Sequence, residues 1–363
     1  MVVCLVNSSS PAKRMPPNLP ALRGGLLAFS AAILFGISTP LVQKFGSGVG
    51  AFTTAALLYA GAAVAGALLR QRVEHEARVV AADIRRLLAM ASTGAVVGPV
   101  ALAWGLQRTS GTSASLMLTL EALFTAVLAW RMYHETMGRA VWTAMLLLFA
   151  GGVLLVLDQA RDGGVRVWGL LAVVVATTAW GLDNALSRTL AERDPGQVVL
   201  AKAILGTTAT ALLAMGFGES LPPAAAALGL FAVGAVGYGL SLRFYLLAQR
   251  AFGAARTGSV FAFAPFIGAA LAVAMGDQSI SWLMASGSVL MLAGVVLHLA
   301  ESHGHEHRHE VTEHEHAHRH DDGHHEHVHV PMPTGAHSHW HRHKPLYHSH
   351  RHVPDAHHTH RHE

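Results

Sequence analysis

The chain has 363 residues, of which 52% are hydrophobic and only 13% are charged. Soluble domains carry roughly 25% charged residues, so this composition excludes an ordinary soluble domain and indicates many membrane spans. The single cysteine, Cys4, excludes a disulfide framework and a metal centre built from cysteines. Residues 1–300 carry 20 Lys/Arg against 12 Asp/Glu, whereas residues 301–363 carry 6 against 10 and hold 23 of the 26 histidines.

The chain begins with a proline- and serine-containing stretch, residues 1–20, which we expect to be a disordered leader without a cleaved targeting segment. After it, apolar runs of about 20 residues recur, the length that a helix needs to cross a bilayer. We therefore predict an all-α polytopic membrane protein with ten transmembrane helices. They are expected at 22–43, 50–69, 87–107, 112–131, 139–157, 166–187, 197–217, 224–248, 256–275 and 279–299.

Lys and Arg are distributed unevenly over the connections between these helices. If the N-terminus is cytoplasmic, fourteen of them lie in inner connections and four in outer ones, namely Lys44, Arg108, Arg161 and Arg166. Because positively charged connections stay in the cytoplasm, we expect a multi-pass protein of the cytoplasmic (inner) membrane with both termini inside.

An internal repeat runs through the apolar part of the chain. Gln107–Gly111 is echoed by Gln249–Gly253, and Ala150–Val153 by Ala293–Val296, at nearly the same offset. The repeat predicts two five-helix units, and an odd number of helices per unit inverts the second copy in the membrane. Inverted repeats are typical of secondary transporters, whose binding site lies between the halves. The predicted organisation is a leader at 1–20, repeats at 21–157 and 166–300, and a tail at 301–363.

Two stretches in the third and fourth predicted helices, Ala101–Gln107 and Ser115–Ala126, resemble the corresponding signature of EamA-type permeases of the drug/metabolite transporter superfamily. Phe263–Ala269 resembles its counterpart in the second half. The usual Glu-Pro pair of that family is divided here between Glu121 and Pro265. The resemblance implies a proton-coupled or facilitative carrier, commonly an exporter, with a central cavity that opens alternately to each side. Some members of that superfamily are linked to nickel and cobalt resistance, and the His-rich tail resembles those of other nickel carriers.

Several polar or aromatic side chains fall inside the predicted helices. A carboxylate at the bilayer centre costs about 2.5–3.5 kcal/mol, so Glu121 is either a cation ligand or proton-exchanging group, or a hydrogen-bonded structural carboxyl. Asp183 either faces the cavity, pairs with Arg188, or reaches toward the inner membrane interface. Because side chains adjacent in sequence cannot share a helix face, only one of Asp183 and Asn184 is expected to face the cavity. Tryptophans either line the cavity or pack at the interface. The candidate cavity residues are Glu121, Asp183, Asn184, Trp104 and Trp180.

Prolines interrupt three of the predicted helices, at Pro40, Pro99 and Pro265. Each removes a backbone donor and frees a carbonyl that neighbouring groups or water must satisfy. They are either hinges for alternating access or passive kinks.

The tail repeats a His-x-His pattern in a charged, low-complexity segment that we expect to be disordered. Neutral imidazole binds nickel, zinc, copper and iron, so a metal-binding role is predicted. The alternatives are that the segment is an expression tag, or that a solvated tail has drifted in sequence without a function. Protonation competes with metal, so affinity should fall as the pH drops from about 7 to 5. The candidate ligands are His298, which ends the last predicted helix, and His303, His305, His307, His309, His314, His316, His318, His320, His324, His325, His327 and His329.

Two transport functions fit this sequence. The first is export of divalent transition metal, nickel or cobalt and then zinc, by alternating access, with the tail collecting metal and protons as the coupling ion. The alternative is export of amino acids, drugs or small metabolites, with the tail as a separate metal buffer. A non-transporting storage or sensory protein would not need an inverted repeat. We expect no enzymatic activity, no required cofactor and no nucleic-acid partner. Nickel, cobalt or zinc is expected to bind the tail, and the bilayer and the cargo are the expected partners.

Overall fold

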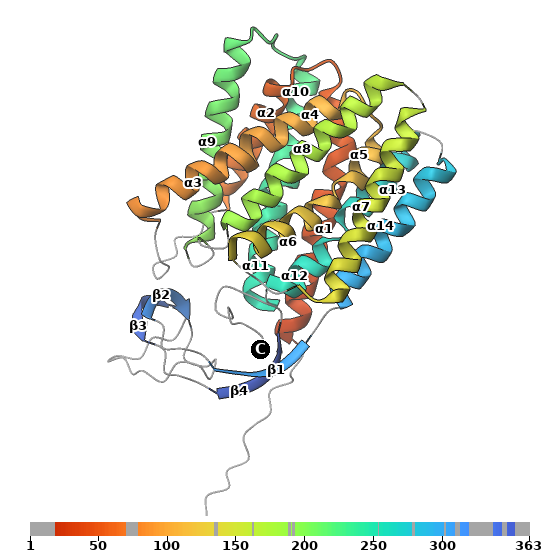
Figure 1. Cartoon of the computed structure of the whole chain (residues 1–363). Coiled ribbons are helices and arrows are strands. Elements are labelled where there is room, and N and C mark those ends of the chain that lie inside the picture. The colour runs from red at the N-terminus through yellow and green to blue at the C-terminus, as the bar shows by residue number, and fades with distance from the viewer. Residues whose placement is uncertain are drawn as a thin grey trace, which may run out of the picture.

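The computed structural model describes the chain as a bundle of helices followed by four short strands (Figure 1). The description covers residues 19–69, 79–133, 137–161, 163–187, 190, 193–252, 254–277, 280–300, 303–308, 313–318, 337–342 and 347–352. Within these residues, eight helical stretches are long and apolar enough to cross a membrane, and two shorter apolar helices, Ala264–Ala274 and Trp282–His298, follow them. The chain is therefore an all-helical polytopic membrane protein in its apolar part.

The first half of the bundle contains seven α-helices, one 3₁₀ turn and one π-helical segment. Apolar residues make up most of the long helices, as expected for helices surrounded by lipid and by one another. The elements are α1 (Leu19–Gly46), α2 (Ala51–Leu68), η1 (Ala81–Asp83), α3 (Ile84–Met90), η2 (Ala91–Val97), α4 (Gly98–Leu106), α5 (Gly111–Met117), α6 (Leu120–Tyr133) and α7 (Arg139–Ala160).

The second half has a similar sequence of elements. It contains α8 (Gly164–Ser187), α9 (Pro195–Gly216), α10 (Ala224–Val233), η4 (Gly234–Leu240), α11 (Ser241–Phe252), α12 (Ala254–Phe261), α13 (Ala264–Ala274) and α14 (Trp282–Ala300). The π-helical segments η2 and η4 start at Ala91 and Gly234. The breaks between α5 and α6 and between α12 and α13 begin at 118 and 262. The offsets, 234 − 91 = 143 and 262 − 118 = 144, nearly agree.

Four of the expected helices are not continuous. The third is divided among α3, η2 and α4, the fourth between α5 and α6, the eighth among α10, η4 and α11, and the ninth between α12 and α13. Apolar composition predicts that a segment lies in the membrane, but it does not reveal where the backbone changes from one helical geometry to another. The leader also ends earlier than expected, because Leu19 and Pro20 already belong to α1.

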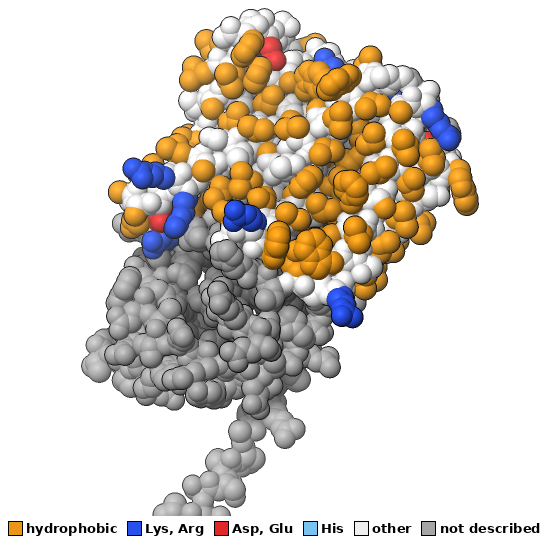
Figure 2. Space-filling model, in the orientation of Figure 1, with side chains coloured by type: hydrophobic (Ala, Val, Ile, Leu, Met, Phe, Trp, Pro, Cys, Tyr) orange, Lys and Arg blue, Asp and Glu red, His pale blue; other side chains and the backbone are white. Residues whose placement is uncertain are grey.

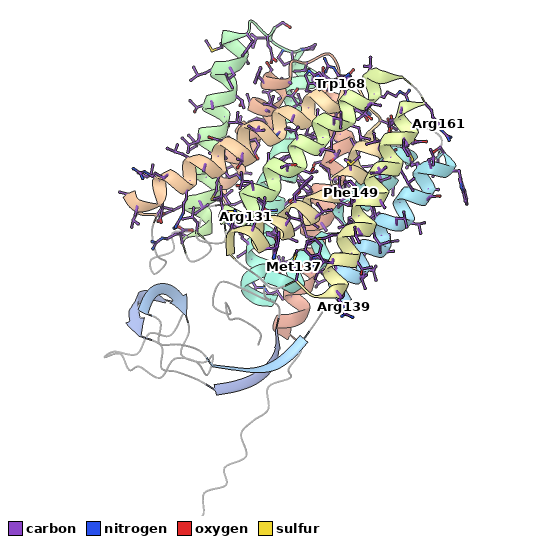
Figure 3. All side chains as sticks on the ribbon, in the orientation of Figure 1. Arg131, Met137, Arg139, Phe149, Arg161 and Trp168 are labelled. Carbon is purple, nitrogen blue, oxygen red and sulfur yellow. The ribbon has the colours of Figure 1, made fainter. Side chains whose placement is uncertain are left out.

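Hydrophobic side chains cover most of the face shown in Figure 2, and the Lys and Arg side chains lie toward its ends. Figure 3 shows the same separation: Arg131 and Arg139 lie toward one end of the bundle and Arg161 toward the other, with Phe149 between them. Large apolar side chains are exposed on the surface of the bundle. Among them, Phe149 is 60% accessible and Trp168 is 65% accessible. Exposed apolar surface of this extent indicates contact with lipid.

The halves are joined at the end of the bundle where α1 meets α2. Glu219, in the connection between α9 and α10, accepts hydrogen bonds from the backbone N–H of Thr53 (2.7 Å) and of Phe52 (3.2 Å) and from the Thr53 hydroxyl. Asp277, which follows α13, accepts from the backbone N–H and the hydroxyl of Thr112 at 2.9 and 3.0 Å. Carboxylates of the second half thus cap helices α2 and α5 of the first.

The Glu219 cap gives a first testable prediction. Replacing Glu219 with alanine leaves the first-turn N–H groups of α2 without their acceptor and removes a negative charge from a helix N-terminus. We expect a loss of about 0.5–2 kcal/mol in the free energy of unfolding. Unfolding in detergent should be compared with Ser220→Ala, whose exposed side chain lies in the same connection. Equal stability of the two variants would show that the cap contributes nothing.

The tail contains β1 (His303–Arg308), β2 (Glu313–His318), β3 (His337–Arg342) and β4 (Tyr347–His352). They form two antiparallel pairs, β1 with β4 and β2 with β3. The prediction of a disordered tail is therefore wrong for these four segments. A low content of apolar residues favours disorder, but the His-x-His alternation has the period of two residues that is typical of a strand.

Candidate functional site

The site begins at a backbone carbonyl that no helical N–H satisfies. In η2 the N–H of Gly98 bonds to the carbonyl of Thr93, five residues earlier. The next residue, Pro99, has no N–H, so the carbonyl of Gly94 has no partner within the helix. The Trp180 indole N–H donates to this carbonyl at 3.0 Å, and the Tyr59 hydroxyl also donates to it. One freed carbonyl therefore connects η2 with α2 and α8.

A buried ion pair lies beside the same glycine. The Lys202 ammonium of α9 donates to Oδ2 of Asp183 on α8, and both residues are buried. A Cβ on Gly94 would lie 2.3 Å from that carboxylate oxygen and 2.7 Å from the Lys202 nitrogen. The absence of a side chain at position 94 is therefore what admits the pair. The other oxygen, Oδ1, is buried and has no hydrogen-bond partner among the described residues.

A second polar contact joins α8 to α6 one position further along the chain. The Asn184 amide donates to Oε1 of Glu121 at 2.7 Å. Asn184 is exposed and Glu121 is partly exposed, in contrast to the buried Asp183. Asp183 and Asn184 follow Trp180 by three and four residues, so each of them lies next to Trp180 on the helix surface while the two point in different directions. Helix α8 therefore carries one residue to each of three partners on η2, α9 and α6.

Aromatic rings surround this polar centre. Phe35 of α1 makes an edge contact with Trp180 at a centroid distance of 6.3 Å and another with Tyr238 of η4 at 5.9 Å. Tyr59 and Tyr238 are 5.8 Å apart. Carboxylate, amide and aromatic faces together suit a cationic or hydrogen-bonding organic group.

The structure brings together four of the five predicted cavity residues: Glu121, Asp183, Asn184 and Trp180. Trp104 lies elsewhere, because its ring is covered by the Arg108 guanidinium at 3.7 Å and the residue is 38% exposed. Asp183 and Asn184 face different partners, as adjacent residues on a helix must. The described partner of Asp183 is Lys202, whereas Arg188 lies outside the described residues.

The three prolines occupy different local structures. Pro40 lies inside the continuous helix α1, and Pro99 lies in the first turn of α4 directly after η2. Pro265 lies in the first turn of α13, after the break at 262–263. The backbone changes geometry at two of the three. Whether any of them acts as a hinge stays a prediction.

His298 lies in the last turn of α14 and is partly buried. No group of three or more His, Cys, Asp or Glu that could hold a metal ion occurs within the ranges described above. Among the predicted tail ligands, His303, His305, His307, His314, His316 and His318 belong to strands β1 and β2. The others, His309, His320, His324, His325, His327 and His329, lie outside the described residues.

Sequence reasoning missed several residues of the site. Lys202 is a charged residue within the predicted seventh helix, and the rule that singled out Glu121 and Asp183 would have found it. Tyr59 and Tyr238 gave no such signal, because aromatic residues are common in membrane helices. Gly94 could have been connected to Pro99 only by knowing that the intervening helix has π geometry.

Comparison with known proteins gives the family of this chain. The model of the EamA-like transporter family matches twice, at residues 22–157 and 167–300. An uncharacterized transporter of Methanothermobacter thermautotrophicus is 27% identical over 299 residues, covering 76% of this chain and 86% of that protein. A solved crystal structure with 19% identity and a TM-score of 0.55 covers 76% of this chain and 94% of its own, and shows a shared fold. The chain therefore belongs to the EamA-like transporter family.

Proposed function

We propose that this protein is a secondary transporter of small organic molecules that carry an ammonium or amide group, such as amino acids or drug-like amines. It works by alternating access between two inverted five-helix repeats, in ten spans, with protons as the coupling ion and export as the direction. The two family matches, the repeated π-helical segments and the repeated breaks near residues 118 and 262 support the repeat. The Lys/Arg asymmetry supports a cytoplasmic membrane location with both termini inside.

The observation that carries the choice of cargo is the partner of Asp183. Export of a metal ion would need Glu121 and Asp183 as free ligands, but Asp183 already holds the Lys202 ammonium. The Lys202 charge beside the site repels a divalent cation about twice as strongly as it repels a monovalent ammonium group at the same distance. Among the described residues, Glu121 accepts one hydrogen bond, from Asn184. Its carboxylate can instead accept from an organic ammonium group, and an aromatic ring face can stabilise such a cation.

Divalent transition metal, nickel or cobalt and then zinc, is the second candidate. The histidine-rich tail favours it, since a chelating segment on the cytoplasmic side would collect the ions to be exported. In the first proposal the same tail is a separate metal buffer. The two proposals differ in which solute crosses the membrane and agree on the mechanism.

Transport by the full-length protein in proteoliposomes tests the proposal. Flux of a panel of labelled amino acids and organic amines should be measured beside flux of nickel, cobalt and zinc. We expect an organic flux that Glu121→Gln lowers by about 10–100-fold, because the substitution removes the charge that holds the cationic group. Ser288→Ala, on α14, is the control for a hydroxyl change away from the site.

Metal flux that is lost in Glu121→Gln, without any organic flux, would overturn the first proposal in favour of the second. Flux of neither class would contradict both. Organic flux that Glu121→Gln leaves unchanged would place the binding site elsewhere in the bundle.

A further inference from the structure

The two carboxylates of the site, Glu121 and Asp183, differ in their surroundings. The side chains of the Asp183–Lys202 ion pair are only 9% and 11% accessible. Glu121 is partly exposed, and its one partner among the described residues is the amide of Asn184, which is itself exposed. One carboxylate therefore has an opposite charge beside it, and the other has a neutral group.

The exposure of Glu121 indicates which part of the bundle water and cargo can reach. The residue lies near the middle of the membrane-spanning stretch Gly111–Met132. A carboxylate in contact with hydrocarbon at that depth costs at least about 2.5–3.5 kcal/mol, so its exposed atoms face water or cargo and not lipid. The surface that α6 and α8 share at Glu121 and Asn184 is therefore open to exchange with solvent, unlike the buried ion pair.

The charge of Glu121 has to be balanced whenever the site turns from one side of the membrane to the other. A bound cation can balance it, and so can a proton. Asp183 has no such requirement, because the Lys202 ammonium neutralises it in place. A buried carboxylate whose partner is an ammonium group stays ionised, since protonation would leave the buried ammonium without its counter-charge.

Other charged side chains do not replace these partners. Helices α7 and α8 pack against α6, and α3 packs against α8. The further charged residues of α6, α7 and α8 all lie within three residues of a helix end: Arg131, Arg139, Asp158 and Arg166. On α3, Arg85 and Arg86 are exposed. The Tyr59 hydroxyl, which faces the same region from α2, is bonded to the Gly94 carbonyl.

We propose that Lys202 sets the number of protons exchanged in one transport cycle at one. It holds Asp183 ionised and leaves Glu121 as the one carboxyl of the site that takes up and releases a proton. On one side of the membrane Glu121 releases its proton to water and binds one singly charged cation; on the other side the cation leaves and a proton replaces it. This exchange moves no net charge. The stoichiometry rests on the proposed transport function, whereas the assignment of the proton to Glu121 does not.

Modification by dicyclohexylcarbodiimide tests the assignment without any cargo. This apolar reagent enters the membrane region and adds to protonated carboxyl groups to give a stable N-acylurea, whereas an ionised carboxylate does not react. Purified full-length protein in detergent is treated at about pH 6 and at about pH 8, on either side of neutrality. Mass spectrometry of the peptides identifies the modified residues. Glu219 and Asp277, which lie in connections, are internal controls for reaction outside the membrane region.

We expect modification of Glu121 that increases as the pH is lowered. Asp183 should be modified at least about tenfold less, since an adjacent opposite charge keeps a carboxyl ionised. Lys202→Met should raise the modification of Asp183 to about that of Glu121, because the buried carboxylate then becomes neutral by protonation. Only the monodisperse fraction of this less stable variant is used. The double variant Asp183→Asn with Lys202→Met should be modified at Glu121 as the unaltered protein is.

Similar modification of Glu121 and Asp183 in the unaltered protein would overturn the proposal, and so would modification of neither at both pH values. Folded Lys202→Met with an unreactive Asp183 would show that Lys202 does not control the protonation of its partner. Loss of Glu121 modification in the double variant would show that Glu121 depends on the pair. The readout is chemical modification and not flux, so failure of this proposal is distinguishable from failure of the proposed transport function.

Discussion

Replacing Lys202 with methionine should destabilise the protein by about 3–5 kcal/mol, because it leaves the buried Asp183 carboxylate without its counter-charge. The effect should exceed that of an exposed ion pair, since both partners are buried and Asp183 already has one oxygen without a hydrogen bond. Unfolding in detergent, followed by tryptophan fluorescence, gives the free energy.

The control is the double variant Asp183→Asn with Lys202→Met, which removes both charges from the same space. A neutral pair carries no uncompensated charge, so we expect it to recover most of the stability lost in Lys202→Met. If the double variant loses as much stability as Lys202→Met and Asp183→Asn lose when their separate effects are added, the two residues act independently. The ion pair would then not explain the loss of stability in Lys202→Met. A double variant that is stable but inactive would separate the role of the pair in transport from its role in folding.

Replacing Gly61 or Gly234 with alanine should cost about 1–3 kcal/mol each, because both residues form one close contact between α2 and the segment from α10 to η4. A Cβ on Gly61 would lie 2.0 Å from the Phe231 carbonyl oxygen, and a Cβ on Gly234 would lie 2.0 Å from that of Leu58. A backbone carbonyl cannot change rotamer as a side chain can, so the two helical segments would have to move apart to make room for the Cβ.

Gly66→Ala is the matched control on the same helix, since its Cβ would meet only the Leu200 side chain at 3.9 Å. It should be neutral or slightly stabilising, because alanine is the better helix former. Thermal unfolding of the three variants in one detergent distinguishes the outcomes. If Gly61→Ala is as stable as Gly66→Ala, close contact between these segments does not determine the packing.

The sequence was sufficient to predict the membrane-spanning class, because about 20 consecutive apolar residues have few other uses. It was also sufficient to find Glu121 and Asp183, since a carboxylate inside such a run is rare enough to require a reason. The partners of these groups depend on which helices are neighbours. Neither the Asp183–Lys202 pair nor the Glu121–Asn184 bond has a local sequence signal, because the residues of the second lie 63 positions apart.

The tail shows the opposite limitation. Its composition is polar and repetitive, which by average properties predicts disorder. The alternation at His303–His307 and His337–His341 predicts a strand, but only the pairing of β1 with β4 and of β2 with β3 places histidines opposite one another. Composition and periodicity therefore gave conflicting indications, and pairing between distant segments decided between them.

The missing N–H of Pro99 has a consequence for how the first half holds the second. Were residue 99 any other amino acid, its N–H could donate to the Gly94 carbonyl inside the helix and would compete there with the Tyr59 hydroxyl and the Trp180 indole. A cyclic side chain on one helix thus fixes the rotation of two others about their long axes. The orientation of α8 follows from it, and with that orientation the direction in which Asp183 and Asn184 point.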